Sequence, residues 1–182
     1  MNNNAKIAGS LVMFAVLGLF QTTAEADVKA GDRFEDWAVE CHTFDKDKTL
    51  CVLSQTITAA KTNQRIAKLS IRQNDPARDP VLTALVPLGI ILPAGVTMIL
   101  STGQAQPLAV PLTVETCTPQ GCIGTTRVNA ALLKSLQTAD GLGIRFVPQP
   151  GAKPVTIKGS LKGFAAGFKA LKPTGPQTAV KA

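Results

Sequence analysis

The chain has 182 residues, of which 45% are hydrophobic and 17% are charged, and it carries a formal net charge of +7. This length fits one domain with a sizeable core, and the composition excludes a disordered chain. No apolar run reaches the roughly 18–20 residues that a membrane-spanning helix needs, so a multi-spanning membrane protein is excluded as well.

Residues 1–26 are predicted to be a signal peptide. A single lysine, Lys6, precedes an apolar run over 7–20, and the segment ends on Ala24-Glu25-Ala26. The run is too short to span a bilayer and the alanines suit signal peptidase, so we expect cleavage after Ala26. An uncleaved anchor is the alternative. The processed chain has no expected transmembrane span, and we expect it in the periplasm, secreted, or associated with the outer membrane.

Export determines how the cysteines are interpreted. Cys41, Cys51, Cys117 and Cys122 form an even set, which in an oxidising compartment predicts disulfides. Three pairings are open, and local ring closure favours Cys41 with Cys51 and Cys117 with Cys122. The alternative is a zinc site of four thiolates, although the spacings lack the paired two-residue knuckles of common zinc folds.

Short strands are predicted along the first half of the processed chain. Alternation places Trp37, Val39 and Cys41 on one face of a strand over 36–41. Segments 51–58 and 65–71 alternate in the same way, with Asn63 in the turn between them, and 74–80 is expected to be a loop.

The most apolar stretch of the processed chain is 81–92. Pro87 forbids a continuous strand or helix there and Gly89 permits a sharp bend, so we predict two buried strand pieces joined at Pro87-Leu88-Gly89. A ligand groove is the alternative. Further strands are predicted over 96–102, 108–112, 114–117, 122–128, 142–147 and 155–157.

A helix is predicted over 161–171 with Ser160 as its cap. Its expected buried face consists of Leu161, Phe164, Ala165, Phe168 and Leu171. Gly163 and Gly167 each lower helix propensity by about 1 kcal/mol, which indicates close approach to another element. A helix on a membrane surface is the alternative.

Together these elements predict a mainly β protein, an antiparallel β-sandwich or partial barrel with two short α-helices. The other helix is expected over 130–138, capped by Asn129. We expect a single β-rich domain over 27–172 and a flexible C-terminal tail over 173–182.

The positive charge is concentrated after Thr116. Residues 117–182 hold nine Lys and Arg against one acid, whereas 27–116 hold nine against ten. The candidate basic binding face consists of Arg127, Lys134, Arg145, Lys153, Lys158, Lys162, Lys169 and Lys172. Its expected partners are an envelope or host-surface protein, an anionic lipid or a glycan, and nucleic acid is not expected of an exported, aromatic-poor chain. A solvated face that only aids solubility is the alternative.

The sequence contains no recognisable catalytic or cofactor-binding constellation. The lone histidine, His42, is not accompanied by a G-x-S-x-G motif. The acid pairs Glu35/Asp36 and Asp45/Asp47 fall near turns with lysine neighbours and indicate solvated charges. Phosphate-binding and dinucleotide-binding glycine motifs and a histidine-rich metal set are missing. We therefore expect a protein that is not an enzyme and holds no cofactor or metal.

Several motifs occur in an order that is typical of one family. They are Asp36-Trp37-x-Val39-x-Cys41, Cys51 with Gln55, Pro87-Leu88-Gly89-Ile90, Cys117-x-x-x-Gly121-Cys122 and Ser160-Leu161-x-Gly163-Phe164. Over about 31–171 the chain resembles the invasion-associated locus B family of exported Gram-negative bacterial proteins, and Gly124 is a small departure from its pattern. The resemblance implies a β-rich protein linked in some pathogens to host-cell entry, with no established catalytic residues.

The expected function is that of an envelope protein, stapled by disulfides, that binds a surface partner and promotes host-cell invasion or colonisation. The basic second half would supply attraction, and 81–92 would contribute a docking surface. A periplasmic housekeeping or chaperone-like binder of envelope components is the first alternative. An uncharacterised hydrolase using His42 is the second.

Overall fold

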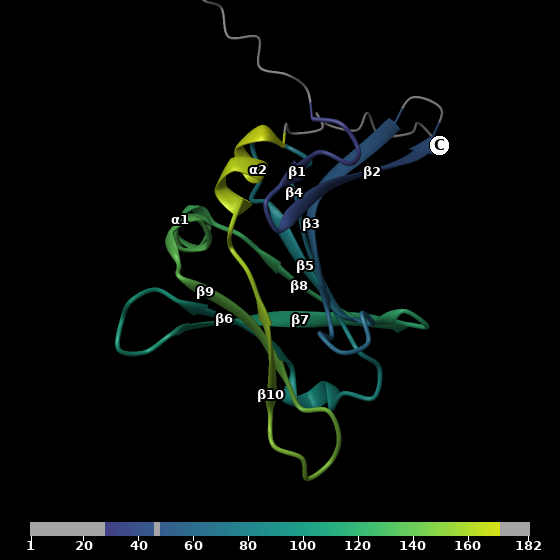
Figure 1. Ribbon diagram of the computed structural model, residues 1–182, viewed down its shortest axis with the longest axis vertical. Helices are drawn as coiled ribbons and strands as arrows, with labels where there is room; N and C mark the ends of the chain where they lie inside the picture. Colours follow the sequence, from purple (N-terminus) through teal and green to yellow (C-terminus); the bar gives the residue numbers. More distant parts are fainter. Residues whose placement is uncertain (1–27, 46–47, 172–182) are drawn as a thin grey trace, which may run out of the picture.

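The protein is built from two antiparallel sheets that share one long strand (Figure 1). The computed structural model describes residues 28–45 and 48–171, so the predicted signal peptide and C-terminal tail lie outside the described residues. The elements are β1 (Arg33–Phe34), β2 (Trp37–Asp45), β3 (Lys48–Thr58), β4 (Arg65–Arg72), β5 (Val81–Val86), the 3-10 helix η1 (Leu92–Ala94), β6 (Val96–Ser101), β7 (Leu108–Thr118), β8 (Gly121–Arg127), α1 (Ala130–Thr138), β9 (Gly141–Phe146), β10 (Val155–Gly159) and α2 (Phe164–Ala170). The predicted fold class is confirmed.

Strand β7 passes from one sheet to the other. Its first half pairs with β6, as in Leu112 opposite Val96, and its second half pairs with β8, as in Thr113 opposite Thr125. The complete order is β1-β2-β3-β4-β5-β8-β7-β6-β9-β10. The two predicted strands over 108–112 and 114–117 are therefore one continuous strand, with a bulge near Glu115.

The core lies between the two sheets and follows the alternation of the strands. Trp37 and Phe164 are fully buried, and their rings meet edge to face with centroids 5.1 Å apart. The strands contribute alternate buried side chains, among them Val39, Leu53, Leu69, Ile71, Leu82, Val86, Met98, Leu100 and Ile144. This burial confirms the predicted inward faces of the first strands.

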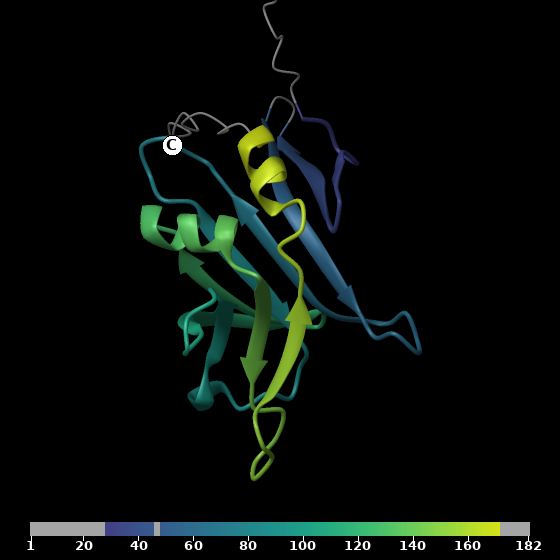
Figure 2. The same cartoon turned by 60° about the vertical axis from the view of Figure 1, so that its left-hand side comes forward.

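Helix α1 begins as predicted, because the Asn129 side chain accepts a hydrogen bond from the backbone N–H of Leu132 at 2.9 Å. Leu132 and Leu136 face the core. Both helices lie at the same end of the molecule (Figure 2). No helix in the described part of the chain is long and apolar enough to cross a membrane.

The prediction of a helix over 161–171 is wrong in its start. Helix α2 covers only Phe164–Ala170, and its N-cap is Gly163 in a left-handed conformation. A helix that started at Leu161 would need a right-handed backbone at Gly163, whose φ is 81°, and the N–H and C=O of Ser160 are hydrogen-bonded to the Gln55 side chain instead. Ala165 is exposed rather than buried. The predicted close approach at Gly167 is confirmed, since an added Cβ would lie 2.6 Å from a methyl group of Leu53.

The prediction of two buried strand pieces over 81–92 is half right. Val81–Val86 form the buried strand β5, and Gly89 bends the chain with a φ of 84°. The second piece is not a strand, because Ile91 leads directly into the 3-10 helix η1, with Pro93 in its first turn. Leu88 and Leu92 are consequently exposed.

Candidate functional site

Both predicted local disulfides are formed. Cys41 and Cys51 lie opposite each other on β2 and β3, and Cys117 and Cys122 lie opposite each other on β7 and β8. Oxidised cysteines cannot act as thiolate ligands, so the zinc alternative is wrong. In the part of the chain that the structure describes, no cluster of three or more His, Cys, Asp or Glu could hold a metal ion.

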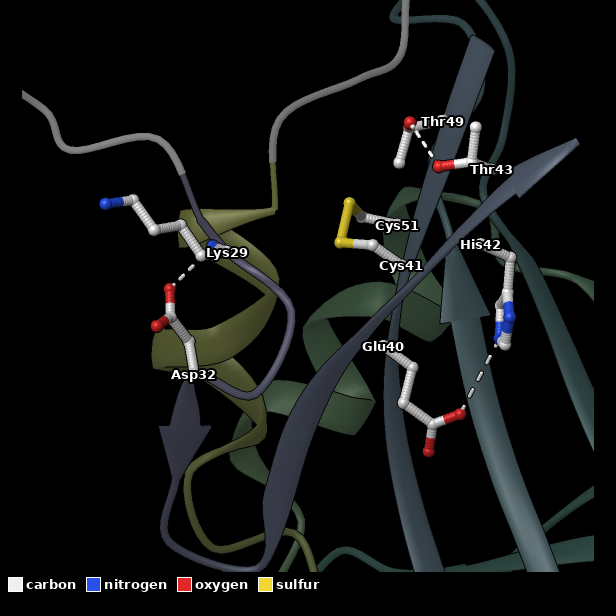
Figure 3. The surroundings of a disulfide bond; sticks show 8 residues. All are labelled: Lys29, Asp32, Glu40, Cys41, His42, Thr43, Thr49 and Cys51. Atoms are coloured by element: carbon white, nitrogen blue, oxygen red, sulfur yellow. Dashed lines mark hydrogen bonds and ion pairs between the residues drawn. A yellow bond between two sulfur atoms is a disulfide. The ribbon is translucent and has the colours of Figure 1, made fainter. Parts of the chain in front are cut away.

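The surroundings of the first disulfide show where His42 lies. In Figure 3 the side chains of Glu40 and His42 are on the side of β2 away from the disulfide. His42 Nε2 is 3.8 Å from Glu40 Oε2, and the Ser54 hydroxyl donates to Glu40 Oε1 at 2.5 Å. The carboxylate thus stands between the hydroxyl and the imidazole. Serine hydrolases need the imidazole in the middle, where it can take the proton of the hydroxyl, so this arrangement gives the hydrolase alternative no support.

Glu40 has a structural partner in Lys68, whose ammonium group reaches across β3 to Glu40 Oε2 at 2.5 Å. Burial raises the pKa of the Glu40 carboxyl, but the hydrogen bonds from Lys68 and Ser54 outweigh it and hold that pKa below its ordinary value. The carboxylate is therefore ionised near neutral pH, as a charge paired within the sheet rather than a proton donor.

The residues of the candidate basic binding face are distributed over several elements. Arg127 ends β8, Lys134 lies on α1, Arg145 on β9, Lys153 between β9 and β10, Lys158 on β10, Lys162 before α2 and Lys169 on α2, while Lys172 lies outside the described residues. Arg145 and Lys158 share the outer face of the β9–β10 hairpin, because Arg145 pairs with Thr156, two residues before Lys158. The hairpin thus places Arg145 and Lys158 on one face, with Lys153 in its loop. Binding by the whole set stays a prediction.

Arg127 lies instead beside two arginines that sequence reasoning missed. Arg72, Val81 and Arg127 are register partners on the neighbouring strands β4, β5 and β8. With Arg78 from the β4–β5 loop they line a surface hollow of about 340 Å³, which we call the arginine hollow. Asn74, Asp75 and Asp79 complete its wall. No sequence signal joins Arg72 to Arg127, because only strand register makes them neighbours.

The loops at the opposite end of the strands contain no acidic residue. Four loops, 59–64, 87–95, 119–120 and 147–154, contain Lys61 and Lys153 but no Asp or Glu, and we call them the acid-free end. The loops are connected. The N–H of Ile91 donates to the carbonyl of Val147 at 2.9 Å, and the Arg65 guanidinium reaches the carbonyl of Gln120 at 3.5 Å.

Large exposed hydrophobic side chains gather at the acid-free end. Leu88 is 55% exposed, Leu92 50% and Val155, directly after the 147–154 loop, 41%. Leu108, at 41%, is the fourth such side chain among the described residues, and it lies at the other end of the sheet. Exposed leucines on a set of loops that contains lysines and no acids are typical of a surface that meets an apolar, negatively charged partner.

Comparisons with known proteins agree with one another. The family model described as invasion associated locus B (IalB) protein matches residues 37–172. Two invasion protein B homologues of Brucella abortus, from strain 2308 and from biovar 1 strain 9-941, are each 31% identical to this chain over 143 residues, 78% of this chain and 78% of the relative. The crystal structure of invasion associated protein b from Bartonella henselae shares the fold, with a TM-score of 0.65 at 20% identity over 77% of this chain and 92% of that chain.

Proposed function

Because the chain belongs to the invasion-associated locus B family, we propose that it is an exported, non-enzymatic envelope protein that binds an anionic membrane surface through its acid-free end. The observation that carries this proposal is the exposure of Leu88 and Leu92 among loops that hold lysines and no acidic residue. The two disulfides support export, since such bonds persist in oxidising compartments.

Two forces combine in this binding. Each lysine or arginine held near an anionic bilayer contributes about 1 kcal/mol, and Lys61, Arg65, Arg145 and Lys153 lie in or beside these loops. Each half-exposed leucine adds about 1 kcal/mol when its remaining surface leaves water. Their sum is on the order of the contribution of a single myristoyl chain, which binds a membrane reversibly.

The lipid side of the proposal is tested by co-sedimentation of the processed protein with vesicles. We expect binding to phosphatidylcholine vesicles that contain a third phosphatidylglycerol, a steep loss of binding as salt rises, and little binding to phosphatidylcholine alone. Equal binding to both vesicle types, or no binding at low salt, would refute the proposal.

The names of the Brucella and Bartonella relatives support a second part, namely that the membrane association assists entry into host cells. Deletion of the gene should then reduce host-cell association and entry, and complementation should restore both. Unchanged entry together with an envelope-stress defect in the absence of any host would favour the housekeeping alternative instead.

A further inference from the structure

The arginine hollow lies at the opposite end of β4 from the acid-free end, because Arg72 ends the strand that Arg65 begins. We propose that this hollow binds an oxyanion carried by a small hydroxylated molecule, such as a uronic acid or a sugar phosphate. The proposal is independent of membrane binding, since it uses different residues.

Two guanidinium groups of the hollow are available for a ligand. The side chains of Arg72 and Arg127 flank that of Val81 in register, and among residues 28–45 and 48–171 neither guanidinium group forms a hydrogen bond or ion pair. Strands are roughly 4.8 Å apart, so the two Cα atoms are separated by about 10 Å, a span that two arginine side chains can close upon one anion. Like charges held this close repel each other, and a bound oxyanion removes that repulsion.

The remaining charges of the hollow do not cancel this attraction. Asp75 is already engaged, because its Oδ1 accepts the N–H of Ala77 at 2.8 Å and its Oδ2 lies 3.5 Å from Arg78 Nε. The carboxylate of Asp79 also lines the hollow. It would repel a bare anion, but it can accept hydrogen bonds from hydroxyl groups on the same ligand.

The wall therefore offers three kinds of contact. Arg72 and Arg127 suit an oxyanion, Asp79 and Asn74 suit hydroxyl groups, and Val81 supplies an apolar floor for the C–H face of a sugar ring. This combination selects a charged, hydroxylated ligand over either inorganic phosphate or a neutral sugar.

The loop that completes the hollow is held by its own hydrogen bonds. Gln73 Nε2 donates to the carbonyls of Asp75 and Arg78 at 2.7 and 3.0 Å, and the N–H of Arg78 donates to the Asp75 carbonyl at 3.0 Å. Binding consequently requires little ordering of the backbone. A volume of about 340 Å³ lies within the range of small-molecule sites, and it exceeds what a phosphate ion alone would fill.

Calorimetric titration of the processed protein tests the proposal with four probes: glucuronate, glucose 6-phosphate, inorganic phosphate and glucose. We expect binding of one or both charged sugars, at least tenfold tighter than inorganic phosphate, and no binding of glucose. The charged sugar that binds more tightly identifies the preferred oxyanion as a carboxylate or a phosphate. Binding of none of the four, or equal binding of inorganic phosphate and the charged sugars, would overturn the proposal.

Variants assign the binding to the hollow. Arg72→Gln and Arg127→Gln should each raise the Kd about tenfold or more, because each removes a charge-assisted hydrogen-bonding group. Arg33→Gln, which removes an exposed arginine on β1, is the matched control and should leave the Kd unchanged. Asp79→Asn keeps both arginines. It should weaken the binding of the charged sugar but not the binding of inorganic phosphate. An unchanged Kd in Arg72→Gln and Arg127→Gln would show that the anion binds elsewhere.

Discussion

The side-chain amide of Gln55 pairs with the backbone of Ser160 in both directions. The N–H of Ser160 donates to Gln55 Oε1 at 2.9 Å, and Gln55 Nε2 donates to the Ser160 carbonyl at 3.0 Å. Trp37 Nε1 donates to the same carbonyl at 3.0 Å. A side chain on β3 thus forms the pair of hydrogen bonds that a neighbouring strand would form, and it links β3 to the residue that follows β10.

Replacing Gln55 with leucine should lower the free energy of unfolding by about 2–3 kcal/mol. Gln55 is only 5% exposed, so the substitution removes three hydrogen bonds of a buried side chain and leaves the Ser160 N–H and the Asp36 carbonyl without this partner. Urea unfolding followed by circular dichroism measures the change. Gln137→Ala on the exposed face of α1 is the control and should change stability by less than about 0.5 kcal/mol. A Gln55→Leu variant as stable as the wild type would refute the role of this link.

Gly163→Ala should destabilise the protein by about 3 kcal/mol. Gly163 has a φ of 81°, and an added Cβ would overlap the carbonyl group of Phe34, so the variant suffers both backbone strain and a clash with backbone. Gly151→Ala separates the two effects. Gly151 has a similar φ of 73° and nothing within 4 Å of an added Cβ, so only the strain of about 1 kcal/mol applies. Equal losses in the two variants would show that the contact with Phe34 is unimportant.

The Glu40–Lys68 pair should give the stability a dependence on acid pH. Because the folded-state pKa of Glu40 lies below its ordinary, unfolded-state value, the pair stabilises the protein fully at pH values above the unfolded-state pKa. The stabilisation disappears as the pH falls through the folded-state pKa. The side chains are 25% and 33% exposed, so the contribution is about 0.5–1 kcal/mol.

Unfolding free energies of the wild type and Glu40→Gln at pH 7 and pH 3 measure this dependence. The variant should be less stable than the wild type at pH 7 and should approach it at pH 3. Lys68→Met should lose the same pH-dependent part of the free energy of unfolding, because it removes the other member of the ion pair. A difference that is the same at both pH values would contradict the assigned ion pair.

Features that depend on neighbouring residues could be predicted from the sequence. The inward faces of the strands follow from alternation, the start of α1 follows from Asn129, and each disulfide joins cysteines on adjacent strands of one hairpin. These features need no knowledge of distant parts of the chain.

Features that depend on distant residues could not be predicted. The segment that precedes α2 is held by Gln55, which precedes Ser160 by 105 positions. The arginine hollow arises because β8 pairs with the distant strand β5 as well as with β7, which brings Arg127 beside Arg72. The charge imbalance pointed to the basic second half, but the acid-free end also uses Lys61 and Arg65 from the first half.

The most direct test of the proposed function is to compare two leucine variants for binding to the anionic vesicles. Leu88→Gln combined with Leu92→Gln removes the two most exposed large hydrophobic side chains of the acid-free end, whereas Leu108→Gln removes an exposed leucine at the other end. The double variant should bind at least tenfold more weakly than the wild type, and Leu108→Gln should bind as the wild type does. Unchanged binding in the double variant, or an equal loss in Leu108→Gln, would contradict docking through the acid-free end.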